Sequence, residues 1–64
     1  MNINAILLAH IPGRTNAGAR KALRDAYASN GLVALTGVAG SIAFSRGIGD
    51  SIVAAVAAAE TTDA

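Results

Sequence analysis

Residues 31–59 read GLVALTGVAGSIAFSRGIGDSIVAAVAAA, and this stretch decides the fold. It is apolar and built almost wholly from small residues, and a polar segment at 45–50, SRGIGD, interrupts it once. Two glycines lie close together in that segment, which favours a sharp turn. Alanine is the strongest helix former, so we expect a helix over about residues 51–60, with Asp50 or Ser51 as its N-cap.

The chain before this turn predicts a longer helix over about residues 15–45. The β-branched residues within 31–44 leave a strand as an alternative for that part. The spacing of four between the small residues Gly37 and Ser41 favours a helix, because this spacing lets two helices approach closely. Asn30 and Gly31 are together typical of a helix C-terminus, because both tolerate left-handed backbone. If the helix does not end at Gly31, it continues unbroken to the turn.

The first eleven residues form a short apolar segment that Pro12 and Gly13 end. One helical face of this segment holds Ile3, Ile6, Leu7 and His10. The segment has no basic start, so it does not have the pattern of a secretory signal, and it is too short to span a bilayer. The expected architecture is therefore all-α, a helical hairpin with a turn at 45–50 and a short N-terminal helix, in one domain of residues 1–64.

The composition indicates a protein that needs partners to be stable. The chain has 64 residues, of which sixteen are alanine and seven glycine, with one Phe, one Tyr, no Trp and no Cys. A scaffold this small, with no disulfide, usually needs oligomerisation or very regular helix packing. The hydrophobic fraction is 53% and the mean hydropathy is +0.49, so we expect the apolar surface to meet other copies of the chain or lipid.

Small residues on both predicted helices are the candidates for packing between copies. They allow two helix backbones to approach closely, which larger side chains prevent. The predicted packing residues are Gly37, Gly40, Ser41, Ala43, Ala54, Ala55 and Ala58.

Charge is unevenly placed along the chain. Four of the five cations but only one of the four acids lie in residues 1–30. At about 100° per residue, these cations fall in a sector of roughly 120° on the helix that follows Gly13. This basic stripe consists of Arg14, Arg20, Lys21 and Arg24.

Three interpretations of the basic stripe compete. It is a solvated helix face, a surface for the phosphates of double-stranded DNA without base readout, or the positively charged flank of a membrane segment. The membrane interpretation meets a difficulty, because the apolar run before Arg46 is fourteen residues and about 20 are needed. Spanning would bury Arg46 with Asp50, four residues on, at a large energetic cost.

No catalytic, cofactor or metal site is predicted. His10 is the only histidine and has neither a cysteine nor an acidic cluster beside it, so we expect a packing or interfacial role. The glycines at 37–40 lack the lysine of a phosphate-binding loop, and GIGDSI at 47–52 has only two glycines of a dinucleotide fingerprint. A helix-turn-helix is disfavoured, because the segment after Gly31 carries no side chain that reads base edges.

The chain resembles, in format, the small all-helical major coat proteins of rod-shaped and filamentous DNA viruses. The features that carry the resemblance are the basic stripe, the small-residue body at 31–44, the turn SRGIGD and the helix after it. Filamentous phage coats place the acidic part first, whereas here the basic part comes first, so the chain is more similar to the clavavirus type of bacilliform archaeal virus with double-stranded DNA. The resemblance implies many identical subunits around DNA, with the basic stripe facing the genome and Arg46 joining or replacing it.

The sequence thus predicts a structural coat subunit located in a virion, which is not an enzyme and whose partners are copies of itself and the DNA backbone. The alternative is a small membrane-embedded helical protein, such as a pilin-like or accessory subunit. A membrane-active peptide is a further alternative, and the net charge of only +1 disfavours it.

Overall fold

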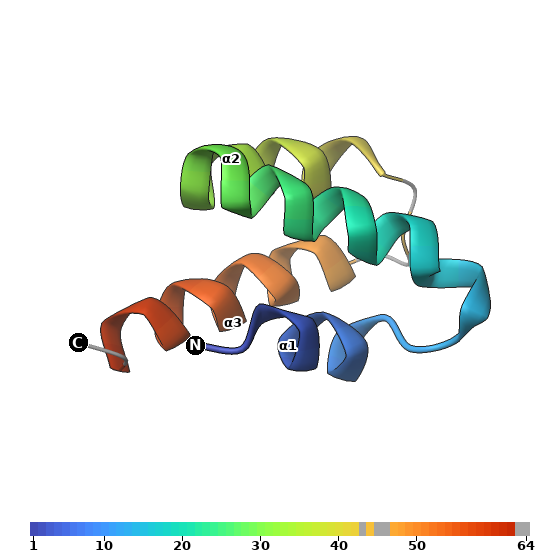
Figure 1. Ribbon diagram of the computed structural model, residues 1–64, viewed down its shortest axis with the longest axis horizontal. Helices are drawn as coiled ribbons and strands as arrows, with labels where there is room; N and C mark the ends of the chain where they lie inside the picture. The colour runs from blue at the N-terminus through green and yellow to red at the C-terminus, as the bar shows by residue number, and fades with distance from the viewer. Residues whose placement is uncertain (43, 45–46, 63–64) are drawn as a thin grey trace.

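The computed structural model describes residues 1–42, 44 and 47–62. Its elements are α1 (Ile3–His10), the 3₁₀ turn η1 (Arg14–Asn16), α2 (Ala17–Ser41) and α3 (Ile48–Thr62). Figure 1 shows the second half of α2 and α3 as the arms of a hairpin, with α1 and the first half of α2 packed beside them, and no strand occurs in these residues. The all-α class, the hairpin and the short N-terminal helix are confirmed.

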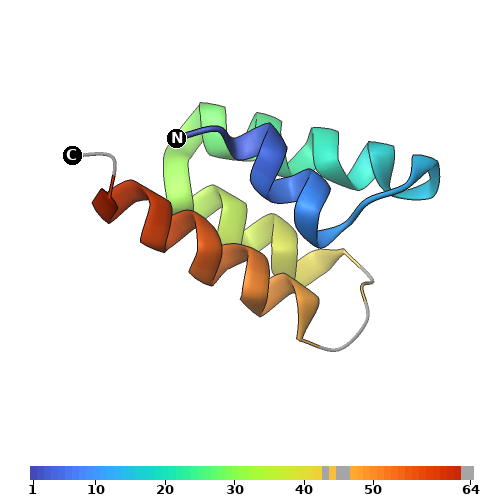
Figure 2. The same ribbon diagram turned by 90° about the horizontal axis from the view of Figure 1, so that it is seen from below.

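The long arm of the hairpin is broken in its middle, at Asn30 and Gly31. Asn30 has φ −147° and ψ 24°, and Gly31 has φ 71° and ψ −154°, so neither is helical. The two halves of α2 run in roughly opposite directions (Figures 1 and 2). A straight helix of its 25 residues would be about 37 Å long, but the whole molecule extends 33 Å at most. The unbroken helix expected over 15–45 does not form, and the chain turns at the stop signal that Asn30 and Gly31 provide.

The helix N-termini differ from the expected ones. α1 is capped by Asn2, whose side-chain oxygen accepts a hydrogen bond from the Ala5 N–H at 3.1 Å. α3 begins at Ile48, before the expected start at 51, and the Ser51 hydroxyl donates to the Gly47 carbonyl at 3.0 Å. Ser51 is therefore not an N-cap. Asp50 lies in the first turn, where a carboxylate interacts favourably with the helix dipole.

The start of α2 and the end of α3 also use side chains in ways that the sequence did not indicate. Asn16 occupies the N-cap position of α2 but makes no capping bond, because its amide donates to the Pro12 carbonyl at 2.9 Å. α3 continues to Thr62, two residues beyond the expected end at about residue 60. There the hydroxyls of Thr61 and Thr62 donate to carbonyls one turn earlier.

One hydrophobic cluster joins all three α-helices. Its buried members are Leu7, Ile11, Leu23, Leu35, Ala39, Ile52 and Val56. Three pairs of them are four residues apart, the spacing that places two side chains on one helix face. Burying a leucine, isoleucine or valine side chain stabilises the fold by about 1.5–3 kcal/mol, so these few side chains account for most of the core.

The second half of α2 and the beginning of α3 approach closely at Gly49. A Cβ atom built there would lie 3.0 Å from the Ala39 carbonyl oxygen. The Cα radius of gyration is 10.6 Å, which agrees with about 10.7 Å for a compact chain of this length. The turn within α2 therefore gives a compact body in place of a long rod.

Candidate interaction surfaces

Arg20, one of the four cations of the basic stripe, is engaged within the protein. It is partly buried, and its Nη1 donates to the carbonyl oxygens of Ile11 at 2.5 Å and Gly13 at 2.8 Å. These bonds fix the segment that leads from α1 into η1. The sequence predicts Arg20 in the DNA-facing set and gives no sign of this role, because the carbonyls belong to residues seven and nine positions earlier.

Lys21 and Arg24 flank an acid, Asp25. Lys21 Nζ donates to Asp25 Oδ2 at 2.8 Å, and Arg24 Nε lies 3.6 Å from Asp25 Oδ1. The hydrogen bond from Lys21, together with the charges of Lys21 and Arg24, holds the pKa of Asp25 below its ordinary value. All three side chains are exposed, so this group presents two cations and one acid to solvent.

Arg14 is exposed on η1, and its guanidinium group makes no hydrogen bond or ion pair with any residue that the structure describes. The basic stripe therefore presents three exposed cations, namely Arg14, Lys21 and Arg24. Arg46, which the sequence analysis added to the set, lies outside the described residues.

The predicted packing residues lie mainly on the surface. Exposed members are Gly37, Gly40, Ser41, Ala54 and Ala58, while Ala55 is half-buried and Ala43 lies outside the described residues. A Cβ atom at Gly37 or Gly40 would meet nothing within 4 Å. These glycines do not serve packing within one molecule, and their faces are open to another chain.

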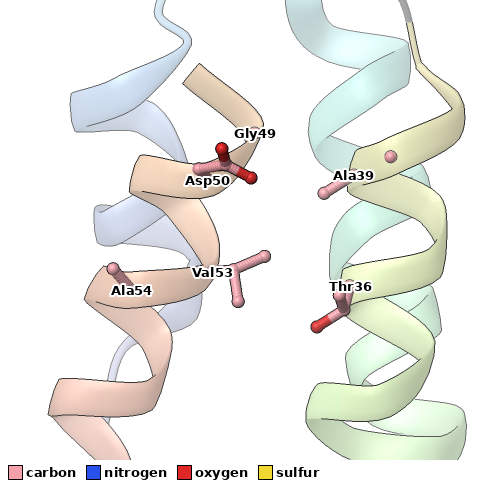
Figure 3. A pocket seen from close by; sticks show the side chains of 7 residues that line it. Thr36, Ala39, Gly49, Asp50, Val53 and Ala54 are labelled. Carbon is pink, nitrogen blue, oxygen red and sulfur yellow. The ribbon is translucent and has the colours of Figure 1, made fainter. Parts of the chain in front are cut away.

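A groove lies between the second half of α2 and the start of α3, with a volume of about 320 Å³. Its lining consists of Thr36, Ala39 and Gly40 from α2 and of Gly49, Asp50, Val53 and Ala54 from α3. Figure 3 shows Asp50 and Val53 directed toward α2, opposite Thr36 and Ala39. Sequence reasoning named Gly40 and Ala54 for packing but did not find the groove, because it forms only where α2 and α3 meet.

The acids of the described residues differ in whether they have partners. Glu60 accepts a hydrogen bond from the Tyr27 hydroxyl at 2.5 Å, which joins α2 to the end of α3. Asp25 has the two partners given above. Asp50 is exposed and makes no hydrogen bond or ion pair with another described residue through its carboxylate.

His10 lies at the end of α1 and is half-buried. Its Nδ1 is 2.9 Å from the Ile6 carbonyl oxygen, which accepts a hydrogen bond from the ring N–H. The described residues contain no group of three or more His, Asp or Glu side chains that could hold a metal ion. No described helix is both long enough and apolar enough to cross a membrane.

Comparison of the chain with family models, with curated proteins and with solved structures finds no match.

Proposed function

We propose that this protein is a structural subunit that assembles with copies of itself, as the coat of a rod-shaped virion around double-stranded DNA. The observation that carries the proposal is the exposure of the small-residue face, with open space at Gly37 and Gly40. Glycine within a helix costs about 0.5–1 kcal/mol relative to alanine. Contact with a neighbouring helix, which comes closest where side chains are smallest, would offset that cost.

The size of the core supports the same proposal. Seven of the described residues are buried, one of them an alanine, and a domain of this length is marginally stable alone. Any partner that binds only the folded chain shifts the folding equilibrium toward it by mass action. Assembly would therefore stabilise each subunit as well as build the coat.

The exposed cations are the basis for the DNA part of the proposal. Lys21 and Arg24 lie on the first half of α2, and Arg14 lies just before it on η1. Such cations would contact phosphates without reading sequence. Asp25 opposes this contact, because its carboxylate repels the DNA backbone.

Electron microscopy of the purified protein, without detergent and with or without double-stranded DNA, tests the proposal. We expect rods or filaments that contain DNA at low salt. If two or three cations contact phosphates, the affinity of unassembled protein for DNA should fall with a log–log salt slope of about −1.8 to −2.7.

Two variants separate assembly from DNA binding. Arg24→Glu should remove DNA from the assemblies and leave self-association intact, whereas Asp25→Asn, the control at the neighbouring position, should strengthen DNA binding. Protein that stays monomeric at all concentrations would overturn the proposal. Protein that ignores DNA and dissolves only with lipid or detergent would instead favour the membrane alternative.

A further inference from the structure

The groove between α2 and α3 contains an acid that has no side-chain partner in the part of the chain that the structure describes. Asp50 lies at its edge, and the remaining lining is mostly apolar, with Ala39, Val53 and Ala54. This combination fits a side chain that has an apolar stem and a cationic head. Lysine and arginine bury their methylene groups along apolar surface while the charge stays at the rim.

The described residues hold a matching cation on a different element. Arg20 is bonded to two carbonyls, and Lys21 and Arg24 share Asp25. Arg14 on η1 has no such partner among the described residues, and no ion pair joins it to Asp50 in one molecule. Among the described residues, one acid and one cation therefore remain unmatched, namely Asp50 in the groove and Arg14 on η1.

We propose that the groove is the docking site for a second copy of this chain, with Arg14 of that copy placed against Asp50. This inference rests on the proposed self-assembly and specifies the contact that makes it. The volume of about 320 Å³ lies at the lower end of the range of pockets that enclose ligands, so one long side chain can enter it. Gly40 has no Cβ atom at the rim, so a neighbouring backbone can approach.

When each copy uses its groove toward one neighbour and its Arg14 toward another, the contact is head-to-tail, and it propagates as a helix if the rotation between copies does not close a ring. That is the geometry which a rod-shaped coat requires. The pairing also assigns separate tasks to the exposed cations. Arg14 joins subunits, and Lys21 and Arg24 remain available for DNA.

Charge reversal tests the pairing, with the oligomeric state measured by sedimentation velocity over a range of concentrations without DNA. Asp50→Lys and Arg14→Glu should each weaken self-association by about tenfold or more, the lower end for close interfacial charge pairs. The variant with both reversals should recover wild-type association to within about threefold, by double-mutant-cycle reasoning. Arg24→Glu, which changes the net charge as Arg14→Glu does, should leave association unchanged.

Gly40→Leu provides a test that does not depend on charge. Its Cβ meets no atom within 4 Å, and leucine is a better helix former than glycine, so the variant should fold. The side chain should obstruct the groove and leave folded monomers, with folding checked by circular dichroism.

The outcomes distinguish this inference from the broader proposal. Wild-type protein that assembles while Gly40→Leu and Asp50→Lys assemble equally well would overturn the groove as the docking site and leave self-assembly standing. A double reversal that fails to restore association would overturn the choice of Arg14. Wild-type protein that never associates would overturn both.

Discussion

Arg20 anchors the segment between α1 and α2 by donating from one guanidinium nitrogen to two carbonyl oxygens. Hydrogen bonds from charged groups contribute about 1.5–3 kcal/mol, and Arg20→Met leaves the Ile11 and Gly13 carbonyls without this donor. We expect the free energy of unfolding, measured with urea, to fall by about 1–3 kcal/mol. Arg24→Met is the control and should change it by less than about 0.5 kcal/mol, because Arg24 is exposed. Equal stability of both variants would show that the Arg20 bonds contribute nothing in solution.

Asp25 gives the protein a pH dependence of known sign. Its pKa is lower in the folded than in the unfolded chain, so its contribution to stability is present above the unfolded value of about 3.9. That contribution is lost as the pH falls through the folded value. Asp25→Asn should therefore reduce stability at pH 7 and leave it unchanged near pH 2, by urea unfolding at both. Because the group is exposed, 1 M NaCl should diminish the difference at pH 7. An unchanged difference in high salt would contradict this account.

Alanine substitutions at Gly49 and at Gly40 compare a close contact between α2 and α3 with an open position. Gly40→Ala meets open space and should stabilise the protein by about 0.5–1 kcal/mol, the helix preference for alanine. Gly49→Ala places a Cβ 3.0 Å from the Ala39 carbonyl oxygen, which belongs to a helix backbone that moves little. We expect Gly49→Ala to lower the thermal midpoint and Gly40→Ala to raise it. Midpoints that rise alike would show that α2 and α3 separate at no cost.

At the scale of the element, the reversal within α2 depends on Gly31. Its φ of 71° and ψ of −154° lie in a backbone region that only glycine adopts freely, at a cost of about 1–3 kcal/mol for other residues. Gly31→Ala should destabilise the protein by about that amount, and Gly37→Ala, in the helical part of α2, should stabilise it. Denaturant unfolding of both variants measures this. A stable Gly31→Ala protein with an increased hydrodynamic radius would show that α2 can straighten into one long helix.

The elements themselves could largely be predicted from local sequence. Alanine content indicates α3, and Pro12 and Gly13 indicate the end of α1. Whether the chain turned at Asn30 and Gly31 or continued could not be predicted, because a glycine in a helix costs too little to stop it without tertiary packing. The expected start of α3 is wrong because Asp50 and Ser51 resemble N-cap residues, and both residue types fit equally well inside the first turn of a helix.

At the scale of the whole molecule, the small residues of this stretch predict that Gly37 and Gly40 pack between copies. The structure places both on the surface, and packing between copies stays a prediction. The groove and the Arg20 bonds could not be predicted, because both join segments whose proximity follows from the reversal in α2. Assigning Arg20 to the DNA-facing set used its angle on a helix, and that angle does not reveal a carbonyl oxygen in a preceding loop. The groove and the Arg20 bonds therefore depend on contacts between segments distant in sequence, which local sequence patterns do not reveal.

The position of α1 has a consequence for how the chain folds during synthesis. α1 contacts α3, and Leu7 belongs to the same buried cluster as Ile52 and Val56. α1 leaves the ribosome before α3, so the part of its apolar face that packs against α3 stays exposed until α3 has been synthesised. A peptide of residues 1–41 should show less helix by circular dichroism than these residues have in the full chain, and adding a peptide of residues 42–64 should raise it. Strong helicity in the first peptide alone would contradict this order. In the cell, the exposed apolar face of the nascent α1 would be a target for chaperones until translation has passed Val56.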